Sequence, residues 1–141
     1  MKKLLFTTII LVVNLLAHGE SNDAGMKLLM KGDKKGALKI FQKECDIDKN
    51  GWACGNAAIM FERGLGVNKN TLKAKEYDKK GCDLNDVDSC RNLAEILLVE
   101  DKNSLSAKVY FQKVCRMKKY ARNSLELKAV KDSCEKAKTI K

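Results

Sequence analysis

Six cysteines are the residues of this 141-residue chain whose type and spacing most directly predict chemistry. They are Cys45, Cys54, Cys82, Cys90, Cys115 and Cys134. An even set of cysteines in an exported chain predicts a disulfide framework. Metal binding is the competing interpretation, but structural zinc sites need C-x2-C spacings or histidine partners. The chain after its amino-terminal segment has neither, so we expect no metal and no cofactor.

The chain has a single histidine, His18, and it falls within the segment that we expect to be removed on export. Catalysis by Ser-His-Asp or Cys-His groups and HExxH zinc sites therefore have no histidine to use. Ser133 and Lys136 fit the S-x-x-K start motif of serine β-lactamases. The companion S-D-N and K-T-G motifs are absent from the sequence, so we interpret this match as accidental.

An acidic turn lies between the first two cysteines. Four of its residues match the first half of a calcium-binding EF-hand loop: Asp46, Asp48, Asn50 and Gly51. The position that needs a bidentate glutamate is Ala57, so we interpret the segment as an Asx-rich turn that caps the next helix. That helix is expected to begin near Trp52, the only tryptophan. Trp52 either anchors the turn against a disulfide or contacts a partner at the surface.

Residues 1–19 have the character of a secretory signal peptide. Two lysines precede an apolar run over 4–16, and small residues follow where a signal peptidase cleaves. We expect cleavage after Gly19, with Ala17 as the alternative. The run is shorter than the roughly 20 residues of a membrane-spanning helix. The mature chain, residues 20–141, is therefore predicted to be one secreted or periplasmic domain without a transmembrane segment.

The chain is basic. Its formal net charge is +10, and removal of the signal peptide takes away two lysines and no acid, which leaves +8. Positive charge favours polyanionic partners such as anionic lipid or polysaccharide. All but four of the basic residues are lysines, and lysine lacks the bidentate fork that suits phosphate and base recognition. We therefore expect no nucleic-acid partner.

Hydrophobic periodicity and turn residues predict a chain of helices. The expected helices cover residues 24–31, 34–45, 52–63, 71–82, 87–100, 105–117 and 123–139. No segment alternates as a strand does, and the absence of proline fits helices joined by glycine and Asx turns. We therefore predict an all-α fold, with Met30, Leu72 and Tyr77 among the residues that form the apolar faces of their helices.

A repeated pattern links three of these helices. Three alanines each stand eight residues before a cysteine: Ala37, Ala74 and Ala107. Large apolar residues follow each alanine by three or four positions, and the periods are 37 and 33 residues. Helix pairs that repeat at this period are typical of an α-solenoid, in which the small alanine lets helices approach closely.

A longer motif runs from Ala57 to Cys82. It is formed by Ala57, Phe61, Gly64, Gly66, Val67, Lys73, Ala74, Tyr77, Gly81 and Cys82. This motif resembles a Sel1-like repeat, and with its closely spaced cysteines the chain resembles the Helicobacter cysteine-rich proteins. The resemblance implies a short right-handed α-solenoid of TPR-like helix–turn–helix repeats stapled by disulfides. Its parts are a half repeat over 24–45, a full repeat over 52–82, a degenerate repeat over 87–115 and a C-terminal capping helix over 123–139.

The resemblance also implies how the cysteines pair. In that family the two cysteines of each C-x7-C unit bond to each other and tie the end of one repeat to the start of the next. The implied disulfides are Cys45–Cys54, Cys82–Cys90 and Cys115–Cys134. The first has one residue more than the family spacing, and the third is the remaining pair, with eighteen intervening residues instead of seven.

The function expected from this architecture is binding. A repeat solenoid presents an extended concave surface, so we expect a monomer that binds a protein or peptide on the face formed by helices 52–63 and 87–100. The alternative that the resemblance implies is a penicillin-binding protein or weak β-lactamase, with β-lactams or peptidoglycan fragments as ligands. The sequence supplies no nucleophile–base pair for such amide hydrolysis, so no catalytic residue is predicted.

Overall fold

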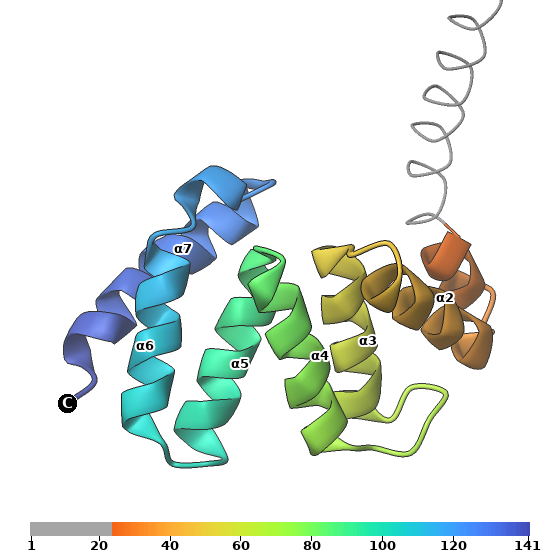
Figure 1. Ribbon diagram of the computed structural model, residues 1–141, viewed down its shortest axis with the longest axis horizontal. Helices are drawn as coiled ribbons and strands as arrows, with labels where there is room; N and C mark the ends of the chain where they lie inside the picture. The colour runs from red at the N-terminus through yellow and green to blue at the C-terminus, as the bar shows by residue number, and fades with distance from the viewer. Residues whose placement is uncertain (1–23) are drawn as a thin grey trace, which may run out of the picture.

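The computed structural model describes residues 24–141, which form helices joined by turns (Figure 1). A helical segment at 24–30 is followed by α2 (Lys34–Asp46), α3 (Gly51–Arg63), α4 (Thr71–Asp83), α5 (Val87–Val99), α6 (Ser104–Cys115), the 3-10 helix η1 (Lys118–Tyr120) and α7 (Ser124–Thr139). The described residues include no strand, which confirms the predicted all-α fold. None of the described helices is long and apolar enough to cross a membrane. The predicted signal peptide, residues 1–19, lies outside the described residues.

The helices begin where short polar side chains can cap them. Each of α2 to α7 has an aspartate or asparagine as its N-cap, and the side-chain oxygen accepts a hydrogen bond from the backbone N–H three residues later. These caps are Asp33, Asn50, Asn70, Asp86, Asn103 and Asn123. A cap satisfies an N–H group that the first turn leaves without a helical partner. The Asx positions therefore predict where these helices start.

Successive helices pack as a row of hairpins (Figure 1). α3 packs on α4 and α5 packs on α6, while α4 packs on α5 and α6 packs on α7. α3 also contacts α5, and α5 contacts α7, so the first helices of successive hairpins share one side of the row. Disulfides join each hairpin to the next: Cys45–Cys54 between α2 and α3, Cys82–Cys90 between α4 and α5, and Cys115–Cys134 between α6 and α7. The architecture is thus repeat-like, with a covalent bond at each junction.

The repeated alanines lie in the packed interior. Ala37, Ala74 and Ala107 are all 0% exposed, and so are Phe41 and Phe111, which follow the first and last of them by four residues. An alanine side chain occupies little space, so neighbouring helices approach closely while the aromatic rings fill the space beside them. The buried core therefore follows the period of the sequence repeat.

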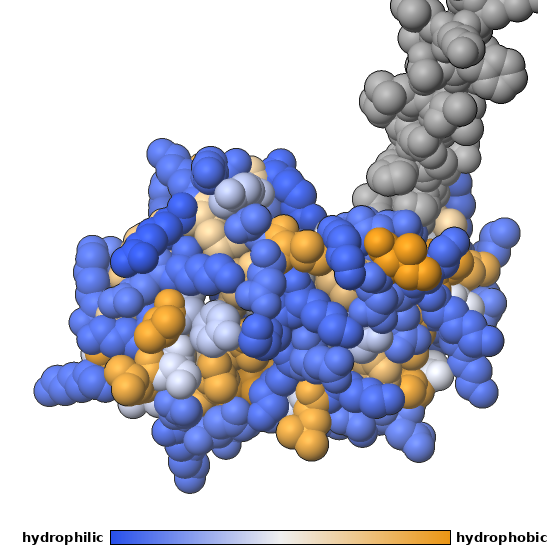
Figure 2. Space-filling model, in the orientation of Figure 1, coloured by the Kyte–Doolittle hydropathy of each residue, from blue (hydrophilic) through white to orange (hydrophobic). Residues whose placement is uncertain are grey.

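Two residues that we expected on apolar helix faces lie at the surface instead. Met30 is 84% exposed and Leu72 is 76% exposed. Leu72 is five residues before Tyr77, which places the two side chains about 140° apart around α4. Tyr77 stacks on Phe61 of α3, with 5.5 Å between ring centroids, so Leu72 points away from α3. Figure 2 shows exposed hydrophobic side chains as small separate groups on a mostly hydrophilic face.

A glycine allows α4 and α5 to meet closely. A Cβ built on Gly81 would lie 2.7 Å from the Cβ of Ser89, far inside normal contact. Ser89 in turn donates its hydroxyl to Asp86, the cap of α5, at 2.7 Å. The close approach at Gly81 lets Cys82, the next residue, bond to Cys90 on α5 with 4.4 Å between their Cα atoms.

The turn between α3 and α4 yields a stability prediction. Gly66 has a φ of +73°, and a Cβ there would lie 2.7 Å from the backbone carbon of Lys34 at the start of α2. Gly32 has a φ of +85°, but a Cβ there would meet nothing within 4 Å. Gly66→Ala is expected to lower the free energy of unfolding by about 3 kcal/mol and the control Gly32→Ala by about 1 kcal/mol, because only the first adds a clash to backbone strain. Urea denaturation measures both losses, and equal losses would contradict the packing of this turn on α2.

Candidate functional site

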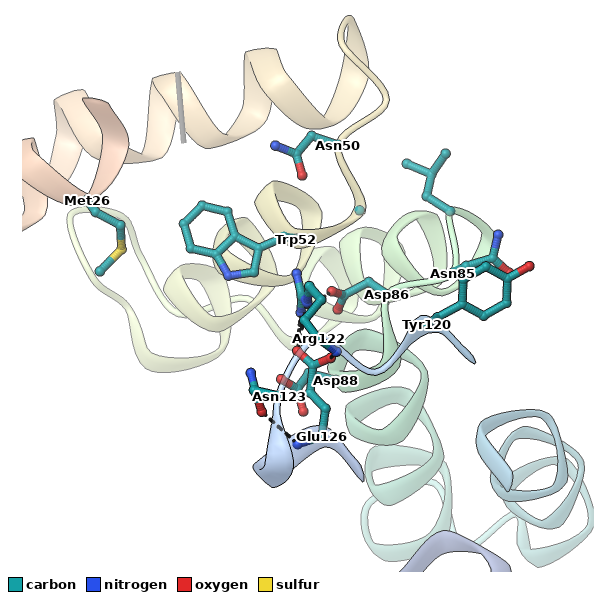
Figure 3. A pocket seen from close by; sticks show the side chains of 12 residues that line it. Met26, Asn50, Trp52, Asn85, Asp86, Asp88, Tyr120, Arg122, Asn123 and Glu126 are labelled. Atoms are coloured by element: carbon teal, nitrogen blue, oxygen red, sulfur yellow. Dashed lines mark hydrogen bonds and ion pairs between the residues drawn. The ribbon is translucent and has the colours of Figure 1, made fainter. Parts of the chain in front are cut away.

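A hollow of about 900 Å³ lies where α3, α5 and α7 begin (Figure 3). Its lining comes from the segment 24–30, the start of α3, the turn between α4 and α5, and the segment 120–126. The lining residues with the most distinctive chemistry are Trp52, Asp86, Asp88, Tyr120, Arg122 and Glu126. The helix starts lie together at this end of the row, so side chains distant in the sequence meet there.

Arg122 connects the start of α7 to the start of α5. Its Nη2 donates to Oδ2 of Asp86 at 2.8 Å, and its Nε donates to Oε1 of Glu126 at 2.8 Å. Its backbone N–H donates to Oε2 of Glu126, also at 2.8 Å. Asp86 and Glu126 are only 6% and 3% exposed, whereas the Arg122 side chain is 43% exposed. One guanidinium therefore holds two buried carboxylates, an arrangement that we call the Arg122 clamp.

The two carboxyl groups of the clamp respond differently to their surroundings. Burial raises the pKa of Asp86, although hydrogen bonds from Ser89 and the charge of Arg122 oppose this change. Burial also acts to raise the pKa of Glu126, but the hydrogen bonds and charge of Arg122 outweigh it and hold this pKa below its usual value. Glu126 and Arg122 therefore form a charged pair at neutral pH, with Asp86 as the more readily protonated member.

Removal of the clamp gives a second stability prediction. Arg122→Gln is expected to lower the free energy of unfolding by about 2–3 kcal/mol, because two buried carboxylates lose their shared partner. The matched control is Arg116→Gln, since Arg116 is exposed and forms no ion pair with the described residues. This control should change stability by less than about 0.5 kcal/mol. Losses of the same size in the two variants, measured by urea denaturation, would contradict the role of the clamp.

Trp52 lines the same hollow from the first turn of α3 (Figure 3). Its ring packs edge-on against Phe41 of α2, with 5.7 Å between centroids and an angle of 82° between the rings. The side-chain amide of Asn56 donates to its carbonyl oxygen at 2.9 Å. The contact of Trp52 is thus with the Phe41 ring and not the disulfide that we expected, and contact with a partner stays a prediction. Trp52 anchors the start of α3, by contact with a buried ring, and it remains partly exposed to the hollow.

A second hollow, of about 410 Å³, lies along α5 and α7, and Asp88 lines both hollows. We call the two together the inner groove. Leu125 lines this second part and is 77% exposed. The charged side chains in it are paired across or along the helices: Arg91 with Asp88 at 3.5 Å, Lys128 with Asp132 at 3.3 Å, and Lys136 with Glu95. The groove thus combines exposed apolar surface with charges that already have partners.

The S-x-x-K match does not form a catalytic pair. Ser133 is 1% exposed and donates its hydroxyl to the carbonyl of Ala129 at 2.7 Å. Lys136 pairs with Glu95 of α5. A hydroxyl bonded to its own helix, beside a lysine held by a carboxylate, is not arranged as a nucleophile with its base. The geometry agrees with the interpretation of this motif as accidental.

The acidic turn before α3 serves the fold. Asn50 caps α3 by accepting from the backbone N–H of Ala53. Asp46 accepts from Lys80 at 2.9 Å and from the hydroxyl of Tyr77 at 3.3 Å, so it ties α2 to α4. Within residues 24–141 no group of three or more His, Cys, Asp or Glu side chains could hold a metal ion.

The inner groove only partly matches the binding face expected from the sequence, helices 52–63 and 87–100. α3 and α5 do contribute, through their first turns and the side of α5 that faces α7. The segment 120–126 and α7, which we had interpreted as a cap, supply the rest. The sequence holds one indication that this region belongs to the site. Arg122 is one of only four arginines, and it stands four residues before Glu126.

The fold and the groove define the class of protein: an all-α chain of helical hairpins with a disulfide at each junction. No protein-family model matches the chain. The chain is similar to the cytochrome c oxidase assembly factor 7 homolog of Drosophila melanogaster, with 35% identity over 54 residues. The match covers 38% of this chain and 20% of the relative, so it spans about a fifth of the relative's length.

Proposed function

We propose that this protein is an exported binding module that holds a segment of a protein partner in the inner groove. The observation that carries this proposal is that the two hollows are neighbours, since both are lined by Asp88 and by residues of α5. An extended peptide is bound best by a long surface with several subsites, and a row of hairpins supplies such a surface.

The lining suits a peptide with both apolar and basic side chains. The larger hollow has three carboxylates, Asp86, Asp88 and Glu126, against the one guanidinium of Arg122, so its charge is negative on a chain of net charge +10. The Asp88 side chain is 46% exposed and its one ion pair is long, at 3.5 Å. The nearby ring of Trp52 adds a surface that favours cations as well as apolar groups. We therefore infer that the bound segment carries a lysine or arginine next to an apolar residue.

We further propose that the hairpins form a short right-handed Sel1-like solenoid with the inner groove on its concave side. The row of hairpins, the buried alanines of the repeat and the motif from Ala57 to Cys82 support this interpretation. Three disulfides are typical of oxidising compartments such as the periplasm or the cell exterior, which supports secretion or a periplasmic location. The name of the Drosophila relative, an assembly factor, supports a role that involves other proteins.

Two matched leucines allow the proposal to be tested. Leu125 and Leu105 each follow an Asn-Ser pair at the start of a helix, and they are 77% and 74% exposed. Leu125 lines the groove, whereas Leu105 on α6 lines neither hollow. Leu125→Asp and Leu105→Asp therefore make the same chemical change in the same helical position, inside and outside the groove.

The experiment is capture of partners by the oxidised protein from an envelope extract of its own organism, with quantitative mass spectrometry. We expect a captured protein to be reduced at least about tenfold by Leu125→Asp, because a charge would enter the apolar part of the groove. Leu105→Asp should leave the capture unchanged. Capture that survives Leu125→Asp, or that both variants abolish, would contradict binding in the inner groove.

A further inference from the structure

The disulfide between Cys115 and Cys134 differs from the other two in its exposure. Both of its cysteines are partly exposed to solvent. The four cysteines of the other disulfides are buried, at 2% exposure or less. Thiol–disulfide exchange begins when a thiolate reaches a sulfur atom of the disulfide, so access decides which disulfide reacts first. In the folded protein, Cys115–Cys134 is the disulfide that a dissolved thiol can reach.

The surroundings of this disulfide also favour attack by an anion. Arg116 adjoins Cys115, and Lys118 and Lys119 follow in η1; all three are exposed and form no ion pair with the described residues. On α7, the nearby acids Asp132 and Glu135 are each paired with a lysine of the same helix. Positive charge attracts an incoming thiolate and stabilises the thiolate that leaves.

The same disulfide is the covalent tether between α6 and α7. Of the side chains on α7, the buried apolar ones are Val130 and Ala137, both small, whereas α3 buries two large ones, Met60 and Phe61. The Arg122 clamp and the pair of Lys136 with Glu95 also link α7 to α5. The two buried apolar side chains of α7 pack in small clusters with residues of α5 and α6. A terminal helix with so little buried apolar surface depends on its covalent link to stay docked.

α7 is also one wall of the inner groove. Residues 120–126, which lead into α7, line the larger hollow, and one side of α7 from Leu125 to Lys136 lines the smaller one. Undocking of α7 would therefore remove a wall from both hollows, while α2 to α5 keep the two buried disulfides that join α2 to α3 and α4 to α5.

We propose that Cys115–Cys134 is a thiol–disulfide exchange site whose opening undocks α7 and dismantles the inner groove. A thiolate attacks one of the two sulfurs, a mixed disulfide forms, the Cys115–Cys134 bond breaks, and the other cysteine leaves as a thiolate that takes a proton from water. A second thiolate then displaces the protein sulfur from the mixed disulfide, which leaves both cysteines reduced and two thiol molecules joined as a disulfide. The consequence for partner binding rests on the proposed function; the exchange and the undocking do not.

The test begins with graded reduction of the full, oxidised protein by reduced glutathione, followed by alkylation and peptide mapping. We expect Cys115 and Cys134 to be labelled at least about tenfold faster than the other four cysteines, because attack on a buried disulfide must wait for an opening of the fold. Simultaneous labelling of all six cysteines, or earlier labelling of another pair, would overturn the proposal.

Hydrogen exchange of the selectively reduced protein then tests the undocking. Amides of α7 should exchange at least about tenfold faster than in the oxidised protein, while those of α3 and α4 remain protected. The emission of Trp52, the only tryptophan, should shift as the wall of its hollow is lost. The double variant Cys115→Ser with Cys134→Ser should reproduce both changes without reductant. If the amides of α7 keep their protection after Cys115–Cys134 is selectively opened, the proposed undocking is wrong. Because no partner is present in this experiment, such a result would not contradict the proposed binding function.

Discussion

Reduction of all three disulfides is expected to unfold this protein at neutral pH without denaturant. Loop closure predicts that each short disulfide, Cys45–Cys54 and Cys82–Cys90, contributes about 2.5 kcal/mol and the longer one about 3 kcal/mol. Together they approach the whole stability of a small domain, which is roughly 5–15 kcal/mol. The core is modest, since many of its buried apolar residues are alanines and the cysteines themselves.

Far-ultraviolet circular dichroism before and after reduction and alkylation measures the effect. Most of the helical signal should be lost, together with the cooperative thermal transition. The control is oxidised protein treated with the alkylating reagent alone. The oxidised protein has no free cysteine within residues 24–141 that the reagent could modify. A reduced and alkylated chain that keeps its helical signal and unfolds cooperatively would show that packing alone holds the hairpins together.

The buried carboxyl of Asp78 is expected to make stability fall as pH rises. Asp78 lies on α4 and is 2% exposed, and one of its oxygens, Oδ1, has no hydrogen-bond partner among the described residues. Burial, followed by the negative charges of Glu62 and Asp86, raises its pKa from the ordinary 3.8 to about 8, against an opposing hydrogen bond from Asn92. The folded protein therefore keeps this carboxyl protonated at pH values where the unfolded chain ionises it.

The direction of the pH effect follows from proton binding. Between pH 4 and pH 8 the folded state holds a proton at Asp78 that the unfolded state has released. The contribution of Asp78 to the free energy of unfolding is therefore complete below about pH 4. It is lost as pH rises towards 8, by up to about 1.4 kcal/mol per pH unit. Above the pKa of Asp78 in the folded protein, about 8, stability falls no further, because the carboxyl is then ionised in both the folded and the unfolded state.

Asp78→Asn replaces the carboxyl by a neutral group of similar shape and should flatten this dependence. We expect the variant to be close to the original protein in stability at pH 5 and more stable than it at pH 8.5, in urea titrations across that range. The matched control is Asp132→Asn, a change of an exposed aspartate on α7, which should leave the slope unchanged. If Asp78→Asn and the original protein lose stability in parallel between pH 5 and pH 8.5, Asp78 is not the source of the effect.

The features that the sequence predicted well are local ones. A capping side chain acts on an N–H group three residues away, so the Asx-rich turn with Asn50 marks the start of its helix without reference to the rest of the chain. The spacing of alanines and cysteines repeats along the chain, so the buried alanines could also be anticipated. Leu72 was misplaced because an apolar residue in the first turn of a helix satisfies the periodic pattern only loosely, and packing of Tyr77 decides which face is buried.

The site could be predicted much less well, because it depends on distant contacts. Arg122 and Asp86 are 36 residues apart in the sequence and meet only because α7 docks on α5. Their residue types are common on protein surfaces, so neither residue stands out in the sequence. Asp78 gave no signal either, since an aspartate in a helix usually lies on the solvated face. Asp78 lies on α4, which packs against both α3 and α5, so its burial depends on the packing of the fold.

The most direct test of the central claim is to map where a captured partner binds. Hydrogen exchange of the oxidised protein with and without that partner, or a peptide from it, locates the contact. We expect slower exchange at the start of α3, over 85–91 and over 120–136, with the outward sides of α4 and α6 unaffected. Protection confined to α2, α4 or α6, with the residues of the inner groove unchanged, would contradict it.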